Sequence, residues 1–235
     1  MKMLGLLGGM SWESTSVYYR LINQGVAQRL GGLASAPLLL HSVNFDTVAH
    51  LQREARWDDA GALLGHAAAG LERAGAQGLL IATNTMHKVA PLIQQHSQLP
   101  LLHIGDATGR ALHAAGRRRV GLLGTRFTME DAFLRQHLEQ HFELRCEVPD
   151  AADRDEVHRI IFEELCQGRL VDASRQRYRQ IISQLADRGC DAVVLACTEI
   201  SLLIDPAAGA WPVPLFDTTA LHAQAAVDWI TGDTP

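Results

Sequence analysis

The sequence predicts an α/β protein with two similar doubly wound parallel-sheet domains related by pseudo-twofold symmetry. Two observations carry this prediction. Apolar runs that end in glycine or polar residues alternate with stretches of helical periodicity, which is the pattern of parallel strands with helices on both faces of the sheet. The same series of features then occurs a second time within the 235 residues of the chain.

The first strand of each half is expected at a short apolar run that ends in a small turn. Residues 3–9 read MLGLLGG, and residues 120–125 read VGLLGT. Buried parallel strands are continuous apolar runs of about this kind, and glycine commonly begins the loop that follows. We therefore expect the two segments to occupy equivalent places in the two sheets.

A longer internal match joins the middle of each half. Residues 71–85 read LERAGAQGLLIATNT and align with residues 185–199, which read LADRGCDAVVLACTE. Both copies have an amphipathic helix that ends near a glycine, followed by an apolar strand. On this alignment Thr83 falls on Cys197.

The order of the matches sets the expected domain boundaries. A third pair of segments, residues 99–102 and residues 213–216, comes near the end of each half. We expect residues 1–104 together with 215–235 to form an N-terminal α/β domain, and residues 105–214 to form a C-terminal one. Each domain would be large enough to bury a core of its own.

Small and polar residues lie at the expected carboxyl ends of the strands. They include Gly8 and Gly9 after the first strand, and Thr83, Thr125 and Cys197 after later ones. In open α/β sheets, ligands bind outside the carboxyl ends of the strands. We therefore expect an active site in the cleft between the two domains, although similar units can also stack without sharing a site.

Net charge, the length of apolar stretches and cysteine spacing argue against nucleic-acid-binding, membrane and disulfide-rich proteins. The formal net charge of −5 offers no basic stripe for nucleic acid. No apolar stretch reaches the roughly 18 residues of a membrane span, and the signal-peptide pattern is absent, so we expect a cytoplasmic protein that does not bind membranes. The four cysteines form no C-x-x-C pair, which favours free thiols.

No cofactor and no metal are expected. The eleven histidines show no H-E-x-x-H motif or other ligand spacing. Pyridoxal phosphate needs a Schiff-base lysine, and the chain offers only Lys2 and Lys88, without a phosphate-binding loop beside either. The glycines of residues 5–9 fit neither the dinucleotide pattern nor the P-loop pattern.

The pairing of Thr83 with Cys197 points to proton transfer at a carbon atom. Racemisation at Cα removes a proton from one face of a carbanion and returns one to the other face, so it needs two proton-handling groups on opposite sides. Two similar halves can each supply one group. Cys197 lies before an expected helix, whose amide groups would lower the thiol pKa toward a thiolate. The alternative is an ordinary buried cysteine.

Polar residues beside these two groups are suited to an amino-acid substrate. Backbone N–H groups near Asn84 and Thr85 can hold a carboxylate, Thr198 can donate a hydrogen bond, and Glu199 can accept one from an ammonium group. Helix capping would also explain Asn84 and Thr198. His87 could bond to the first motif or tune its proton exchange, and otherwise has a structural role.

Three motifs, in order, resemble the aspartate/glutamate racemase family over essentially the whole chain. They are Gly8-Gly9-Met10-Ser11-Trp12-Glu13-Ser14-Thr15, Thr83-Asn84-Thr85-Met86-His87-Lys88 and Cys197-Thr198-Glu199-Ile200. The resemblance implies a cofactor-independent two-base racemase of the aspartate/glutamate type, with its active site between two α/β domains and frequently a homodimer. It carries the catalytic pair onto Thr83 and Cys197. It places these residues in the substrate pocket: Met10, Gln52, Asn84, Thr85, Thr125, Thr198 and Glu199.

The first catalytic position departs from the family pattern. Most members have cysteine at both positions, whereas this chain has Thr83, and an ordinary hydroxyl is a poor base. A Cys197 thiolate that abstracts the proton, with Thr83 supplying one to the other face, would still racemise. Because the enantiomers have equal free energy, the asymmetry can change kcat in each direction but cannot make the reaction one-way.

Two other functions stay open at this point. One is a single-cysteine decarboxylase or lyase of the same superfamily, and the other is a non-catalytic amino-acid-binding module. The substrate also stays open, because aspartate, glutamate and short polar amino acids such as homoserine would share these contacts. Arg53 and Arg126 could pair with a distal carboxylate, although arginines are more often solvated.

Overall fold

The computed structural model describes residues 1–208 and 210–232 and has two compact α/β units. The first unit combines Met1–Ile104 with the chain from His222 onward, and the second unit is Gly105–Leu221. Each unit contains a four-stranded parallel sheet with helices packed on both faces. The prediction of two similar doubly wound halves is confirmed.

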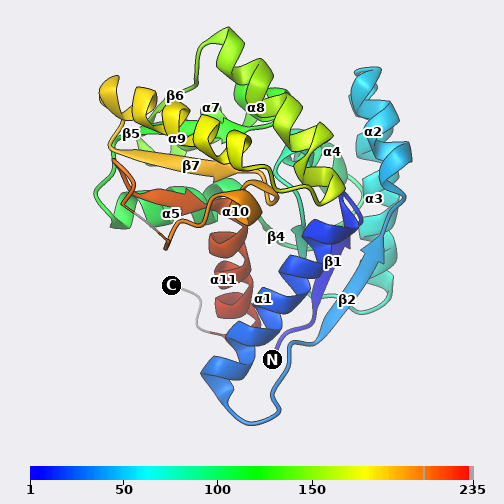
Figure 1. Ribbon diagram of the computed structural model, residues 1–235. Coiled ribbons are helices and arrows are strands. Elements are labelled where there is room, and N and C mark those ends of the chain that lie inside the picture. Colours follow the sequence, from blue (N-terminus) through cyan, green and yellow to red (C-terminus); the bar gives the residue numbers. More distant parts are fainter. Residues whose placement is uncertain (209, 233–235) are drawn as a thin grey trace. The chain divides into compact units, whose positions relative to one another are not determined.

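The sheet of the first unit has the strand order β2-β1-β3-β4, and its neighbouring strands are parallel (Figure 1). The chain begins with β1 (Leu4–Gly8), α1 (Trp12–Leu30), β2 (Leu38–Ser42), α2 (Phe45–Arg53) and α3 (Trp57–Arg73). It continues through β3 (Gly78–Ile81), the 3-10 helix η1 (Thr85–Val89), α4 (Ala90–Gln94) and β4 (Leu101–Leu102). The greater part of α11 (Thr218–Thr231) also belongs to this unit.

Both faces of this first sheet are covered by helices. Leu4 and Leu6 of β1 pack with residues of α1 and α11 on one face. Leu7 packs with residues of α2, α3 and α4 on the other face. Because all of β1 is buried, its sequence is a continuous apolar run and lacks the alternation of a half-exposed strand.

The sheet of the second unit has the order β6-β5-β7-β8 and is again parallel. The first elements here are α5 (Ile104–Ala114), β5 (Arg119–Gly124), α6 (Arg126–Glu130), α7 (Ala132–Phe142), β6 (Arg145–Glu147) and α8 (Ala151–Glu163). They are followed by η2 (Leu165–Gln167), α9 (Asp172–Asp187), β7 (Ala192–Ala196), α10 (Ile200–Leu203) and β8 (Leu215–Asp217). Residues of α5 and α7 cover one face, and residues of α8, α9 and α10 cover the other.

The internal match is repeated in the backbone. Gly75 and Gly189, which the sequence alignment pairs, both adopt positive φ, at 99° and 86°. This region of backbone conformation favours glycine, and it ends a helix so that the next strand can begin. β3 and β7 follow these glycines and hold equivalent places in the two sheets. The predicted duplication therefore extends from sequence to strand order.

The second unit ends at Leu221 and not at residue 214, the boundary expected from the sequence. The reason is that β8 pairs in parallel with β7, so that Leu215 lies opposite Val193 and Asp217 lies opposite Leu195. The strand supplies backbone hydrogen-bonding groups to the second sheet before the chain returns to the first unit.

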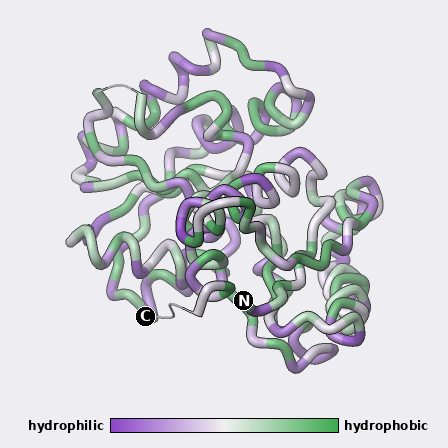
Figure 2. The backbone as a smooth tube through the Cα atoms, turned by 90° about the horizontal axis from the view of Figure 1, so that it is seen from below, coloured by the Kyte–Doolittle hydropathy of each residue, from purple (hydrophilic) through white to green (hydrophobic). Residues whose placement is uncertain are grey.

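The helices expose one side and bury the other. In the tube coloured by hydropathy, hydrophobic and hydrophilic stretches alternate along them (Figure 2), as expected for helices that pack on a sheet. Among the helices of residues 1–208 and 210–232, none combines the length and the apolar character needed to cross a membrane.

Candidate active site

Thr83 lies just beyond β3, where the chain leaves the first sheet. The Ala82 N–H still donates to the Leu7 carbonyl at 2.9 Å, and the Thr83 N–H turns back to the Ile81 carbonyl at 2.8 Å. This turn leaves Thr83 half-buried at the carboxyl end of the strand. The residue therefore lies where parallel sheets usually bind ligands.

His87 holds the backbone of Thr83 and does not reach its hydroxyl as a base. The Nδ1 atom lies 2.8 Å from the Thr83 carbonyl oxygen, and the Ile104 N–H donates to Nε2 at 3.1 Å. Burial, helped by His103 and His222, keeps the pKa of His87 well below its ordinary value. The expectation that His87 bonds to the first motif is confirmed at the Thr83 carbonyl, and an influence on proton exchange at Thr83 stays a prediction.

The other residues of this loop are buried close to the core. Asn84 and Thr85 are almost inaccessible to solvent. The Asn84 side chain does not cap the 3-10 helix that follows, so helix capping does not explain this residue. Pro91 lies in the first turn of α4. The Lys88 ammonium group lies 3.8 Å from the centre of the Trp57 ring.

Two predicted pocket residues of the first unit are also buried. Met10 packs in the core formed with α2, α3 and α4. The Gln52 amide of α2 donates a hydrogen bond to the sulfur of Met86 at 3.0 Å. Gln52 is thus bonded to the segment that follows Thr83, a contact between residues 34 positions apart that no local pattern indicates.

Gly8, the last residue of β1, and Gly9 after it are needed for close packing. A Cβ atom on Gly8 would lie 2.5 Å from the Thr15 methyl group, and one on Gly9 would lie 2.2 Å from the Val43 carbonyl oxygen. Gly9 also has a φ of 87°, and its N–H donates to the Thr15 hydroxyl at 2.8 Å. The loop is shaped by contacts inside the protein, and its glycines do not form a phosphate-binding motif.

In the second unit, Thr125 begins the short helix α6. Its hydroxyl accepts a hydrogen bond from the Thr128 N–H at 3.3 Å, and the residue is buried. The neighbouring Arg126 forms an ion pair with Asp155 at 2.7 Å. Arg53 of the first unit is exposed.

Cys197 follows β7 directly and forms a buried pair with Glu199. The thiol donates a hydrogen bond to Glu199 Oε2 at 3.1 Å, and both residues are more than nine-tenths buried. Thr198 between them is buried as well, and Glu199, not Thr198, occupies the cap position of α10. The pair is a thiol hydrogen-bonded to a carboxylate, and both groups are largely buried.

The pKa of the Cys197 thiol is raised, not lowered as the sequence led us to expect. Burial is the largest cause, followed by the nearby charge of Glu199 and by Cys166. The helix that follows, α10, contains only Ile200–Leu203, which gives little helix dipole to oppose these effects. The resting form is therefore the neutral thiol, and Glu199 is the group placed to take its proton.

The other cysteines differ from Cys197 in their surroundings. Cys190 is buried, whereas Cys146 and Cys166 are only partly buried, and all four cysteines are free thiols. Burial raises the pKa of Cys146 and of Cys166 to about 12. None of these three thiols has a carboxylate acceptor like Glu199 among its hydrogen bonds in the described residues.

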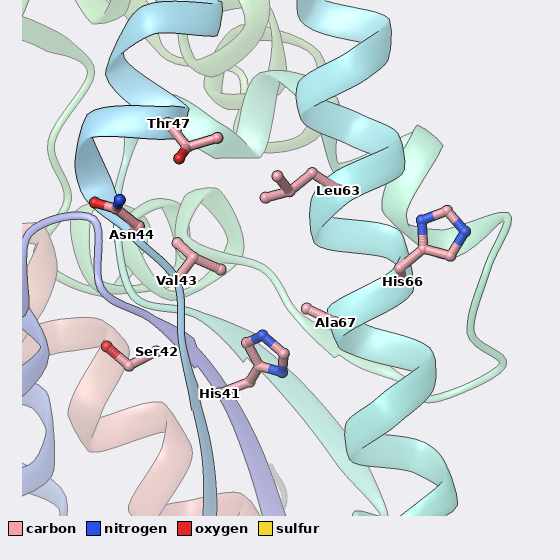
Figure 3. A pocket seen from close by; sticks show the side chains of 8 residues that line it. All are labelled: His41, Ser42, Val43, Asn44, Thr47, Leu63, His66 and Ala67. Carbon is pink, nitrogen blue, oxygen red and sulfur yellow. The ribbon is translucent and has the colours of Figure 1, made fainter.

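A hollow of about 430 Å³ in the first unit lies between the end of β2 and α3 (Figure 3). It is lined by His41, Ser42, Val43, Asn44, Thr47, Leu63, His66 and Ala67. The imidazole rings of His41 and His66 come from different elements, β2 and α3. These residues are not among those that the sequence assigned to the substrate pocket.

Two parallel-sheet units of the same strand order, with Thr83 and Cys197 after equivalent strands, define an α/β protein with an internal repeat. The family model described as Asp/Glu/Hydantoin racemase matches residues 7–226, and the chain therefore belongs to this family. The resemblance seen in the three sequence motifs is confirmed.

Solved structures support the same assignment. A Yersinia pestis protein described as a candidate Asp/Glu racemase is 48% identical, with a TM-score of 0.91 over 98% of this chain and 100% of that one. An aspartate racemase homologue from Pyrococcus horikoshii OT3 is 32% identical, with a TM-score of 0.83 over 98% and 100% of the two chains. The two-sheet architecture is the fold of these racemase relatives.

A curated relative is more distant in sequence. The broad specificity amino-acid racemase RacX of Bacillus subtilis (strain 168) is 22% identical over 227 residues, which cover 96% of each chain. Family and neighbours together support a racemase and an isomerase type of enzyme.

Proposed function

We propose that this protein is a cofactor-independent amino-acid racemase in which Cys197 and Thr83 transfer protons at opposite faces of the substrate Cα. The observation that carries the proposal is the buried hydrogen bond between the Cys197 thiol and Glu199 at the end of β7. Thr83 holds the equivalent place after β3 of the other sheet. A thiol with a carboxylate acceptor is a proton-transfer unit.

The proton transfers of this mechanism balance without a cofactor. Glu199 takes the thiol proton, and the Cys197 thiolate then removes the Cα proton and becomes a thiol again. The carbanion receives a proton on its other face from the Thr83 hydroxyl or from a water that Thr83 holds. The proton on Glu199 returns through solvent to replace the one used at Thr83, and the reverse reaction follows the same steps backward.

The substrate pocket in this proposal keeps the residues that the family resemblance names. Backbone N–H groups near Asn84 and Thr85 would bind the α-carboxylate, and Thr125 and Thr198 would donate hydrogen bonds. Met10 and Gln52 would form the wall of the pocket on the side of the first unit. Within this scheme the protein acts in the cytoplasm, as a homodimer, on a small amino acid.

The substrate is proposed as a short polar amino acid, of which aspartate, glutamate and homoserine are the first to test. The name of the Bacillus subtilis relative, a broad specificity amino-acid racemase, supports testing several compounds side by side. Glu199 already bonds to the Cys197 thiol. Its proposed role is therefore to accept the thiol proton, in place of the ammonium contact expected from the sequence.

The test is proton NMR of L- and D-aspartate, L- and D-glutamate and L-homoserine in D₂O with cofactor-free protein. Loss of the Cα–H signal measures exchange, and chiral analysis measures inversion. Exchange with inversion that disappears in Cys197→Ala supports the proposal and identifies the substrate. Absence of Cys197-dependent exchange with all of these compounds would reject it.

A further inference from the structure

Two buried histidines connect the Thr83 loop to the C-terminal helix within the first unit. His87 lies between the Thr83 carbonyl oxygen, at 2.8 Å, and the Ile104 N–H, at 3.1 Å. His222 of α11 lies between the Leu102 carbonyl oxygen, at 2.7 Å, and the Tyr18 hydroxyl, at 3.0 Å. The two rings are 5.7 Å apart, and both residues are almost completely buried.

The partners of each ring fix where its proton lies. A backbone N–H can only donate, so Nε2 of His87 accepts from Ile104, and the ring proton is on Nδ1, which donates to Thr83. A backbone carbonyl can only accept, so Nε2 of His222 carries a proton and donates to Leu102. The remaining Nδ1 of His222 shares a hydrogen bond with the Tyr18 hydroxyl. His87 therefore has its ring proton on Nδ1, whereas His222 has one on Nε2.

We propose that His87 and His222 are positioning residues that fix the backbone of Thr83, so that its hydroxyl delivers a proton to the correct face of the substrate. His87 connects the Thr83 carbonyl to the start of α5. His222 holds the last residue of β4, two residues before Ile104. This inference rests on the proposed role of Thr83 as a proton donor.

The arrangement is suited to rigid positioning because three of its four partner groups belong to the backbone. Thr83 lies beyond the last strand pairing of β3, so the sheet alone does not hold it. The histidine contacts replace the missing ladder with hydrogen bonds that are screened from water. A displacement of about 1 Å in a reacting group can lower a rate roughly a hundredfold.

Three titratable side chains face His87 or its partner ring: His103, at 4.6 Å between ring centres, His222, and Tyr18 behind it. Protonation of His87 would add a charge to this buried group and would force Nε2 to turn from the Ile104 N–H. Nitrogen NMR of the imidazole rings should therefore show His87 neutral with its proton on Nδ1, and His222 with its proton on Nε2, near neutral pH. The opposite tautomer at either ring would overturn the proposal, whether or not the protein is active.

The functional test compares inversion with exchange at retained configuration in D₂O. Retained exchange needs only the Cys197 side, whereas inversion also needs Thr83. In His87→Ala we expect the ratio of inversion to retained exchange to fall roughly tenfold or more. In His87→Asn the side-chain amide can still donate to the Thr83 carbonyl, so part of the ratio should return.

A matched control is Val26→Ala, which removes a buried side chain from α1 in the same core as Tyr18 without touching the Thr83 loop. It should lower stability and leave the ratio unchanged. Equal loss of inversion and retained exchange in His87→Ala, or a ratio in His87→Asn no better than in His87→Ala, would overturn the proposal. If the wild-type protein shows no exchange that depends on Cys197, the racemase proposal fails. The NMR measurement of the His87 and His222 tautomers still tests the proposed hydrogen bonds to the Thr83 loop.

Discussion

Replacement of Glu199 by glutamine should make Cys197 more reactive and the enzyme less active. The negative charge of Glu199 is a principal cause, after burial, of the raised pKa of the thiol. Glu199→Gln removes this charge but keeps an oxygen that can accept the thiol proton in a hydrogen bond. The thiol pKa should therefore fall, and more thiolate should be present at neutral pH.

The size of the effect follows from the 3.1 Å contact between the sulfur and the carboxylate oxygen. Two unit charges about 4 Å apart interact by about 4 kcal/mol at an effective dielectric constant of 20. Relaxation around the new amide will reduce this value. We expect iodoacetamide to modify Cys197 about ten to a hundred times faster at a fixed near-neutral pH.

The catalytic rate should change in the opposite direction. Glutamine cannot accept a proton, and general-base groups typically contribute about a hundredfold to ten-thousandfold to rate. Exchange of the substrate Cα–H in D₂O should fall by about that factor in Glu199→Gln. If Glu199 had only a structural role, Glu199→Gln would not both speed alkylation of Cys197 and slow exchange of the substrate Cα–H.

The assay follows alkylation by mass spectrometry, with Cys197→Ala supplying the background of the other three thiols. A matched control is Glu164→Gln, which removes another buried carboxylate of the second unit. Glu164 accepts from Ser174 at 2.6 Å and pairs with Arg159 at 2.9 Å. Alkylation of Cys197 should be unchanged in this control. Slower or equal alkylation in Glu199→Gln would refute the reasoning.

Three further predictions concern the other catalytic position, the first loop and the thiols. Thr83→Cys gives each face of the substrate a thiol, so kcat in the slower direction should rise roughly tenfold or more; unchanged kcat values in both directions would argue against Thr83 as the second group. Gly9→Ala should lower the free energy of unfolding by about 2 to 4 kcal/mol in urea denaturation, because its Cβ would meet backbone atoms. Gly75→Ala, with positive φ but open space around it, should cost about 1 kcal/mol, and equal losses would contradict the steric argument. Above about pH 9 the unfolded chain loses thiol protons that Cys146 and Cys166 keep in the folded protein up to about pH 12. The free energy of unfolding should therefore decrease as pH rises, by about 1.4 kcal/mol per pH unit for each thiol. Urea midpoints at about pH 8 and about pH 10 measure this decrease, and equal midpoints would contradict the raised pKa values.

The fold could be predicted from the sequence more completely than the contacts of the candidate site. The sequence could not place β8, because a short strand such as Leu215–Asp217 joins whichever sheet offers it a pairing edge. It also could not find His222, which meets Tyr18 across 204 residues of sequence. Such contacts leave no local pattern.

The sequence by itself determined the two parallel sheets, their equivalent strands and the places of Thr83 and Cys197 after those strands, because apolar runs and helix-ending glycines such as Gly75 and Gly189 act locally. Only the tertiary structure decided the protonation of the site. The thiol pKa of Cys197 and the tautomer of His87 depend on loss of water and on charges and backbone groups within a few ångströms. Those distances are set by packing. Here packing raises the pKa of the Cys197 thiol, whereas the sequence predicted a lowered pKa and a thiolate.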